Sequence, residues 1–106
     1  MAETLQNRVA IVVGASSGMG RATATLLARS GATVMLAARR KSQLEELRDE
    51  LTEQGASAAI CPTDTASRED VERLIETTIG QFGRIDLLVY ATGTNIPDRA
   101  LDVLTP

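Results

Sequence analysis

The stretch "VAIVVGASSGMGRATATLLARSG", residues 9–31, decides how this chain folds. It opens with five apolar residues, four of them β-branched, and continues through three glycines into a run that reads as a helix. A continuous apolar run of this kind is typical of a strand covered on both faces, as in a parallel sheet. The glycines Gly14, Gly18 and Gly20 lie where the strand gives way to the helix. We therefore expect a strand–turn–helix unit whose turn is rich in glycine.

The rest of the chain repeats the alternation of strand-like and helix-like runs. We expect strands at residues 8–13, 32–38, 56–62 and 84–91, and helices at 18–30, from Ser42 and from Ser67. The expected buried residues of the three helices are Ala22 and Leu26, then Leu44, Leu47 and Leu51, then Val71, Leu74, Ile75 and Ile79. Ser42 with Glu45 reads as a capping box, and Ser67 with Asp70 as a second helix start. Short connections and right-handed crossovers predict an α/β fold, a parallel sheet with helices on both faces.

Composition limits the classes of protein that the sequence fits. The 106 residues make one domain at most, and a net charge of −3 argues against a nucleic-acid binder. No apolar run approaches the roughly 20 residues that span a bilayer, and the start of the chain does not resemble a signal peptide. Cys61 is the single cysteine, which excludes an internal disulfide and fits a reducing compartment. We expect a cytoplasmic protein that binds neither nucleic acid nor membrane.

The glycines suggest a phosphate site. The helix after such a turn directs unpaired N–H groups at the crevice beyond the strand ends, where they favour an anion. A side chain at Gly18 would keep a pyrophosphate from the backbone, whereas the bareness of Gly20 would let the helix pack tightly on the sheet. A tight turn without a ligand is the alternative. A nucleoside-triphosphate loop is excluded, because Arg21 and Ala22 follow Gly20 instead of Lys and Ser or Thr.

The glycine spacing Gly14-x-x-x-Gly18-x-Gly20 resembles that of the short-chain dehydrogenase/reductase family. Asp64 after the third expected strand and "GRIDLLVYATG", residues 83–93, match further landmarks of that family in the right order. The resemblance runs from about Arg8 to Pro106 and includes members like the 3-oxoacyl-acyl-carrier-protein reductases. It implies a Rossmann-type sheet with strand order 3-2-1-4 and a dinucleotide cofactor. Residues 1–106 would then form the cofactor-binding half of the domain, ending after the fourth strand.

The residues after the second expected strand favour NADP(H) over NAD(H). An NAD site has a carboxylate about 20 positions beyond the glycines, to hold the ribose 2′-hydroxyl. Arg39 and Arg40 stand there instead, and a guanidinium binds a 2′-phosphate well. The alternative is a solvated basic loop. However, cations just before a helix oppose its dipole, and a bound phosphate would relieve that conflict. The same residues count against S-adenosylmethionine.

The resemblance extends the candidate site to other residues. It implies that Asp64 accepts a hydrogen bond from the adenine amino group, although an ordinary loop aspartate is the alternative. Ser16 and Ser17 can donate to phosphate or simply fill the turn. The full expected cofactor-binding set is Gly14, Ser16, Ser17, Gly18, Met19, Gly20, Arg39, Arg40, Asp64, Thr65, Ala91, Thr92 and Gly93.

Catalytic residues of the family do not occur in this sequence. Its members use a tyrosine with a lysine four residues later, which lowers the tyrosine pKa. Here Tyr90 is followed at that spacing by Thr94, Lys41 is the single lysine, and there is no histidine. We therefore expect no catalytic residue, no metal site, and Tyr90 as a packing residue. The family's usual Asn-Asn-Ala-Gly is replaced by residues 90–93, "YATG".

Three interpretations follow for the chain as a whole. It is part of a reductase that transfers hydride between NADP(H) and a carbonyl or alcohol, a free-standing nucleotide-binding module, or a folded chain without a tight ligand. In each case the fourth strand would be the sheet edge, with no Lys or Pro protecting it. We expect self-association through Leu87–Ala91, unless residues 93–106 fold back over that edge.

Overall fold

Strands and helices alternate along the chain in a computed structural model, which describes residues 5–16 and 18–91. The strands are β1 (Val9–Val13), β2 (Thr33–Ala38), β3 (Ala58–Pro62) and β4 (Leu87–Tyr90). The helices are α1 (Gly18–Arg29), α2 (Lys41–Glu53) and α3 (Arg68–Phe82). The predicted α/β order is confirmed. None of the helices within the described ranges is long and apolar enough to cross a membrane.

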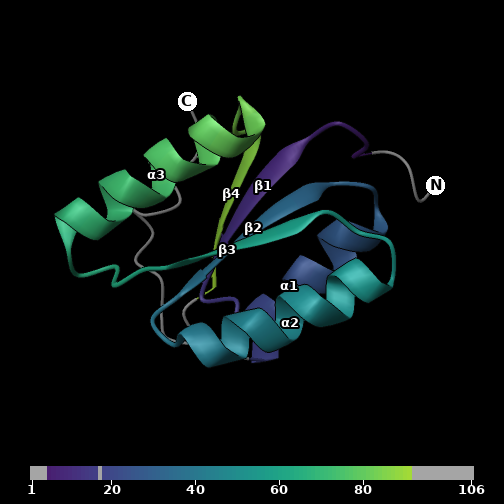
Figure 1. The fold of residues 1–106 in the computed structure, drawn as a ribbon, viewed down its shortest axis with the longest axis horizontal. Helices are drawn as coiled ribbons and strands as arrows, with labels where there is room; N and C mark the ends of the chain where they lie inside the picture. The colour runs from purple at the N-terminus through teal and green to yellow at the C-terminus, as the bar shows by residue number, and fades with distance from the viewer. Residues whose placement is uncertain (1–4, 17, 92–106) are drawn as a thin grey trace.

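The four strands form one parallel sheet in the order β3-β2-β1-β4. At its centre Val12 of β1 is in register with Leu36 of β2 on one side and Val89 of β4 on the other. Helices α1 and α2 cover one face of the sheet and α3 covers the other (Figure 1). This confirms the predicted strand order, and it brings the carboxyl ends of β1, β2 and β3 together at one edge.

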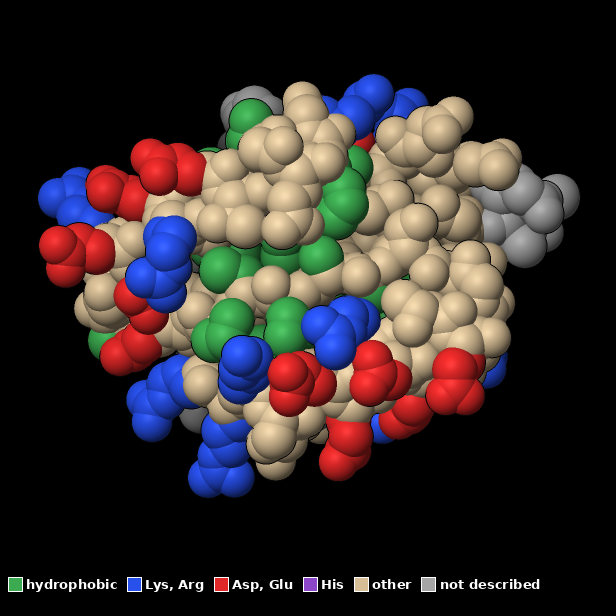
Figure 2. Space-filling model, in the orientation of Figure 1, with side chains coloured by type: hydrophobic (Ala, Val, Ile, Leu, Met, Phe, Trp, Pro, Cys, Tyr) green, Lys and Arg blue, Asp and Glu red, His purple; other side chains and the backbone are tan. Residues whose placement is uncertain are grey.

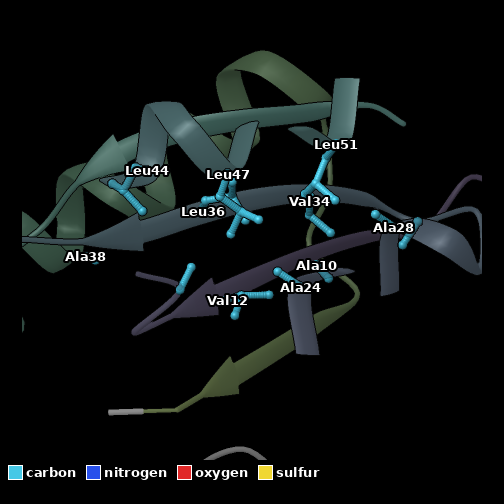
Figure 3. Close-up of a cluster of buried hydrophobic side chains, with 12 residues drawn as sticks. Ala10, Val12, Ala24, Ala28, Val34, Leu36, Ala38, Leu44, Leu47 and Leu51 are labelled. Atoms are coloured by element: carbon cyan, nitrogen blue, oxygen red, sulfur yellow. The ribbon is translucent and has the colours of Figure 1, made fainter. Parts of the chain in front are cut away.

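The larger core cluster fills the space between the sheet and the two helices α1 and α2 (Figure 3). Alternate residues of β1 and β2 contribute Val12 and Leu36 to it, because successive side chains of a strand point to opposite faces. The helix α2 contributes Leu44, Leu47 and Leu51, all fully buried. Burying each large side chain contributes about 1.5–3 kcal/mol. The leucine stripe predicted for α2 is therefore confirmed.

A second cluster lies on the α3 face of the sheet. Its buried members are Ile11, Val13, Met35, Ala37, Cys61 and Leu74. Tyr90 packs against this cluster from β4, so its role in packing was predicted correctly.

The buried faces predicted for α1 and α3 are partly wrong. On α1 the buried residues are Gly20, Ala24 and Ala28, whereas Ala22 and Leu26 are exposed. Small residues let α1 lie close to the sheet, so size and not hydrophobicity selects its inner face. On α3, Leu74 and Thr78 are buried, but Ile75 and Ile79 are 43% and 45% exposed. Two residues of the predicted apolar stripe therefore lie beside the buried face of α3 instead of in it.

The amino-terminal ends of β1 and β4 are tied by Asp86. Its carboxylate accepts a hydrogen bond from the Val9 N–H at 2.8 Å and two from Arg84. Arg8 lies 3.5 Å away as a further ion-pair partner. These contacts, the Arg84 hydrogen bond first, lower the pKa of Asp86 to about 2. The end of the sheet opposite the glycine turn is thus closed by a charged side chain that is fully paired.

Candidate nucleotide-binding site

The turn between β1 and α1 bends sharply at Gly14. Its φ of 86° lies in the left-handed region, which side-chain-bearing residues rarely adopt. The N–H groups of Gly14 and Ala15 both donate to the Ala37 carbonyl, at 2.8 and 3.2 Å. The turn is therefore fixed to the end of β2 as well as to its own strand.

Gly20, in the first turn of α1, packs against this same turn. A Cβ added at Gly20 would lie 2.7 Å from the carbonyl carbon of Gly14 and closer still to its oxygen. Both contacts are to backbone, which cannot move aside easily. At Gly18, in contrast, an added Cβ meets no described heavy atom within 4 Å. Gly20 therefore allows close packing of α1 on the turn, whereas Gly18 faces open space in front of the helix start.

A cavity of about 500 Å³ opens beside the turn, at the carboxyl ends of the strands. Three segments line it: the end of β1 with the glycine turn, the end of β2 with the start of α2, and the loop after β3. Its lining residues are Val13, Gly14, Ser16, Ala38, Arg39, Arg40, Gln43, Thr63 and Thr65. Five of the sequence-predicted site residues meet in this one cavity, although they come from segments up to 51 positions apart.

The helix α2 begins at this cavity with basic residues and no capping side chain. Arg40 is its N-cap, Lys41 is its first residue, and no acidic residue lies in its first turn. The capping box predicted for Ser42 and Glu45 is wrong, because the helix starts one residue before Ser42. The positive end of the helix dipole and the cations repel one another, and an anion placed at this point would be attracted by both.

A second cavity, of about 340 Å³, adjoins the first and shares Arg39 and Thr63 with it. Its other lining residues are Pro62, Asp64, Asp70 and Arg73. The Asp64 carboxylate accepts a hydrogen bond from the Ala66 N–H at 2.9 Å, so it holds the local turn before α3. Arg39 lies between the two cavities. A planar guanidinium there can stack on an aromatic ring as well as bind an anion.

Two polar residues of the cavity were missed by sequence reasoning. Gln43 lies one helical turn after the two arginines, so the period of α2 was the signal that places it beside them. Thr63 directly precedes Asp64 and is 2% exposed, with its hydroxyl donating to the Cys61 carbonyl at 2.8 Å. It therefore shapes the cavity wall.

The remaining predicted residues lie away from the cavity or outside the described ranges. Met19 is 73% exposed and does not line the cavity. Ala91 is buried, and its N–H donates to the Val13 carbonyl at 2.8 Å, at the carboxyl end of β4. Ser17, Thr92 and Gly93 lie outside the residues that the structure describes.

The sequence of the chain is similar to those of known oxidoreductases. The chain is 40% identical over 101 residues to the uncharacterized oxidoreductase Lmo0432 of Listeria monocytogenes, covering 95% of this chain and 40% of that protein. It is 48% identical over 82 residues to the A-factor type gamma-butyrolactone 1'-reductase (1S-forming) of Streptomyces virginiae, covering 77% of this chain and 32% of that protein. The chain therefore spans well under half the length of these two relatives.

A solved structure matches the fold as well. A 7 alpha-hydroxysteroid dehydrogenase complexed with NADH and 7-oxo glycochenodeoxycholic acid superposes with a TM-score of 0.78 at 28% identity, covering 79% of this chain and 33% of that one. A family model described as short chain dehydrogenase matches residues 8–105, which is nearly the whole sequence. Together with the glycine turn and the strand order β3-β2-β1-β4, these matches show that the chain belongs to the short-chain dehydrogenase/reductase family.

Proposed function

We propose that residues 1–106 form the NADP(H)-binding portion of a short-chain dehydrogenase/reductase. The observation that carries this proposal is the cavity in which the glycine turn meets Arg39 and Arg40. Backbone N–H groups at the start of α1 would hold the pyrophosphate, and Ser16 would add a hydroxyl donor. Gly18 leaves open the space that the pyrophosphate needs. The residues present therefore fit a dinucleotide phosphate.

The preference for the 2′-phosphate rests on charge. Arg39 and Arg40 are both exposed at the cavity, and α2 has no acidic residue in its first turn. Among the described residues, no carboxylate lines the first cavity, where one would be needed to hold a free ribose 2′-hydroxyl. One or two charge-assisted hydrogen bonds of about 1.5–3 kcal/mol each correspond to at least a tenfold preference for NADP(H).

Adenine would lie in the adjoining cavity, beside Asp64 and against the guanidinium of Arg39. The backbone of Thr65 would line the ribose side, and Ala91 with Thr92 and Gly93 would lead towards the nicotinamide. In the longer reductase the nicotinamide would supply or accept hydride at a carbonyl or alcohol carbon. A resemblance of the longer reductase to 3-oxoacyl-acyl-carrier-protein reductases is part of this proposal. A cytoplasmic location stays a prediction from Cys61 and the charge balance.

Calorimetry of the 106-residue chain with NADPH and with NADH tests the cofactor proposal. We expect NADPH to bind at least about tenfold more tightly, and Arg39→Ala to remove most of that difference. Arg48→Ala is the matched control, because Arg48 lies on α2, pairs with Asp49 and does not line the cavity. Equal affinities, or equal effects of the two variants, would contradict the 2′-phosphate assignment.

We expect the 106 residues alone to show no NADPH-dependent carbonyl reductase activity. The sequence holds one tyrosine, Tyr90, which packs against the α3-side core, and Lys41 lies on another element. No tyrosine–lysine pair can therefore transfer a proton to the substrate oxygen. Turnover above background, in protein purified free of host reductases, would overturn this expectation. It would also favour the enzyme over the alternative of a free-standing nucleotide-binding module.

A further inference from the structure

Two side chains of α3 hold the loop after β3 by its backbone. The Asp70 carboxylate accepts a hydrogen bond from the Asp64 N–H at 2.9 Å. One turn later on the helix, the Arg73 guanidinium donates to the Pro62 carbonyl at 3.3 Å. The Asp70 and Arg73 side chains also pair with each other, at 3.2 Å between Oδ1 and Nη2. The loop is therefore fixed to α3 on both sides of Thr63, which lines both cavities.

The hydrogen bond of Asp70 differs from that of an ordinary helix cap. Asp70 is the third residue of α3, and in a capping box the carboxylate at that position accepts the N–H of the N-cap residue. Here the N-cap is Ser67, and its N–H donates instead to the Asp64 carbonyl at 2.9 Å. The Asp70 carboxylate reaches three residues further back, to the Asp64 N–H. It is therefore bonded to the cavity loop and not to the helix start.

The carboxylates of Asp64 and Asp70 both line the second cavity, but their oxygens have different partners. Both oxygens of Asp70 are bonded to the protein, one to the Asp64 N–H and one to Arg73. In Asp64, Oδ1 accepts the Ala66 N–H, whereas Oδ2 has no hydrogen-bond or ion-pair partner among the residues that the structure describes. Asp64 thus keeps one oxygen for a ligand, and Asp70 does not.

The charges of the second cavity also suit a base. Its two carboxylates are balanced by two guanidinium groups, those of Arg39 and Arg73. The first cavity, in contrast, is lined by Arg39 and Arg40 and by no carboxylate of the described residues. Figure 2 shows side chains of both signs gathered at the end of the molecule where α3 begins. A balanced wall favours an uncharged ring over a phosphate, and the cationic wall of the first cavity favours the phosphate.

We propose that Asp70 is a positioning residue for adenine, supported by Arg73. By accepting the Asp64 N–H, it fixes the backbone from which the Asp64 carboxylate reaches the second cavity. Oδ2 of Asp64 then accepts an N–H from the amino group of adenine, whereas a base with a carbonyl in that place offers only another acceptor. This inference rests on the proposed function, because it requires a dinucleotide in the two cavities. Selection of the amino group should then depend on Asp70, although the oxygens of Asp70 are already bonded to the protein.

Calorimetry with NADPH and with its hypoxanthine analogue, which has a carbonyl in place of the adenine amino group, tests the proposal. We expect the unmodified chain to bind NADPH at least about tenfold more tightly than the analogue. Asp70→Ala should reduce this ratio to below about threefold, mainly by weakening the binding of NADPH. Asp70→Asn should keep most of the ratio, because its amide oxygen can still accept the Asp64 N–H.

Glu69→Ala is the matched control. Glu69 is an acidic residue of the same first turn of α3, is exposed and lines neither cavity, so its loss should leave the ratio unchanged. Arg73→Ala is a second test variant. The Arg73 side chain is 56% exposed, so its removal does not threaten the fold, and the loss of the Pro62 contact should lower the ratio part of the way.

Hydrogen exchange of the Asp64 amide gives a readout without ligand. Exchange should be faster in Asp70→Ala than in the unmodified chain, and close to that of the unmodified chain in Asp70→Asn. A ratio that Asp70→Ala and Arg73→Ala leave unchanged, or that Glu69→Ala lowers as much, overturns the positioning role and leaves the proposed function standing. A chain that does not bind NADPH at all contradicts the proposed function, and this inference with it.

Discussion

The helices α2 and α3 both begin at the carboxyl ends of the strands, but their first turns differ in charge and in capping. In α3, the Ser67 hydroxyl accepts a hydrogen bond from the Asp70 N–H at 3.2 Å, and Glu69 and Asp70 complement the helix dipole. In α2, the N-cap is Arg40, no side chain caps the helix, and the first residue is Lys41. A side chain therefore caps one N–H group at the start of α3, and no side chain caps the start of α2.

The difference separates a structural helix start from one adapted to a ligand. A missing cap costs about 1 kcal/mol, and each ill-placed charge costs about 0.3–1 kcal/mol. The α2 start therefore reduces the stability of the chain by itself, and it lies in the cavity with the glycine turn. A bound phosphate would supply both the missing acceptors and the missing negative charge. At the carboxyl ends of the strands, α3 thus begins with its own cap, whereas α2 begins without one and would be stabilised by a bound anion.

The third helix start is that of α1, and a substitution there should have the largest effect on stability. Gly20→Ala should destabilise the chain by about 3 kcal/mol or more, because the new Cβ meets the Gly14 carbonyl, which is backbone. Gly80→Ala on α3 is the matched control, since its Cβ meets no described atom within 4 Å. Alanine there should stabilise the helix by about 0.5–1 kcal/mol. Urea unfolding of both variants measures the two values, and shifts of the same sign would contradict the packing argument.

Ser67→Ala should remove the side-chain cap at the start of α3. We expect a loss of about 1 kcal/mol in the free energy of unfolding, since the Asp70 N–H loses its acceptor. Binding of NADPH should be unchanged apart from that stability, because Ser67 lines neither of the two cavities. Urea unfolding and calorimetry of this variant give the two values. A loss of stability below about 0.3 kcal/mol would mean that the cap contributes little.

Arg40→Asp should make the α2 start resemble that of α3. Arg40 already has the extended backbone of an N-cap, with φ −95° and ψ 109°, so aspartate can cap the helix without rearrangement. We expect the ligand-free chain to gain about 0.5–1 kcal/mol of stability while NADPH binding weakens. Thermal unfolding with and without NADPH shows both effects. A variant that is less stable, or that binds NADPH better, would refute the comparison.

The smallest expected effect concerns the other end of the sheet, where no ligand is proposed. The pKa of Asp86 is lowered to about 2 from its usual 3.8, so its ionised form stabilises the folded state. That contribution is complete above the unfolded pKa of 3.8 and is lost as the pH falls towards 2. Asp86→Asn should flatten the acid dependence of the unfolding midpoint over this range. Parallel curves for the two proteins would show that the pair contributes nothing.

Much of the fold could be predicted from the sequence, because the pattern of side chains has a direct physical meaning there. The apolar run at β1 and the leucine spacing of α2 led to the correct sheet and helix faces. The inner face of α1 could not be predicted in the same way. Ala22 and Leu26 looked like the buried pair, but close approach to the sheet required Gly20 and Ala24 instead.

The parts of the candidate site that lie in loops after strands could be predicted from the sequence. Gly14 and Ser16 were predicted from the glycine turn, Arg39 and Arg40 from their distance beyond it, and Thr65 from the family resemblance. All five line one cavity. Gln43 was missed because it comes from within a helix, where the cavity depends on how α2 is rotated. The start of α2 was also missed, since a serine followed by a glutamate at the right spacing suggested a cap that the helix does not use. Local sequence patterns do not predict contacts that depend on tertiary packing.

The position of β1 at the centre of the sheet has a consequence for the order of synthesis. A ribosome makes β1 before the other three strands of the sheet, and one of its two neighbours, β4, begins only at Leu87. Contacts between segments so far apart form slowly, because a long loop must close before they stabilise the chain. The emerging chain can therefore assemble β1, β2 and β3 with their helices early. The glycine turn acquires its final support on the β4 side only when nearly all of the 106 residues have been made.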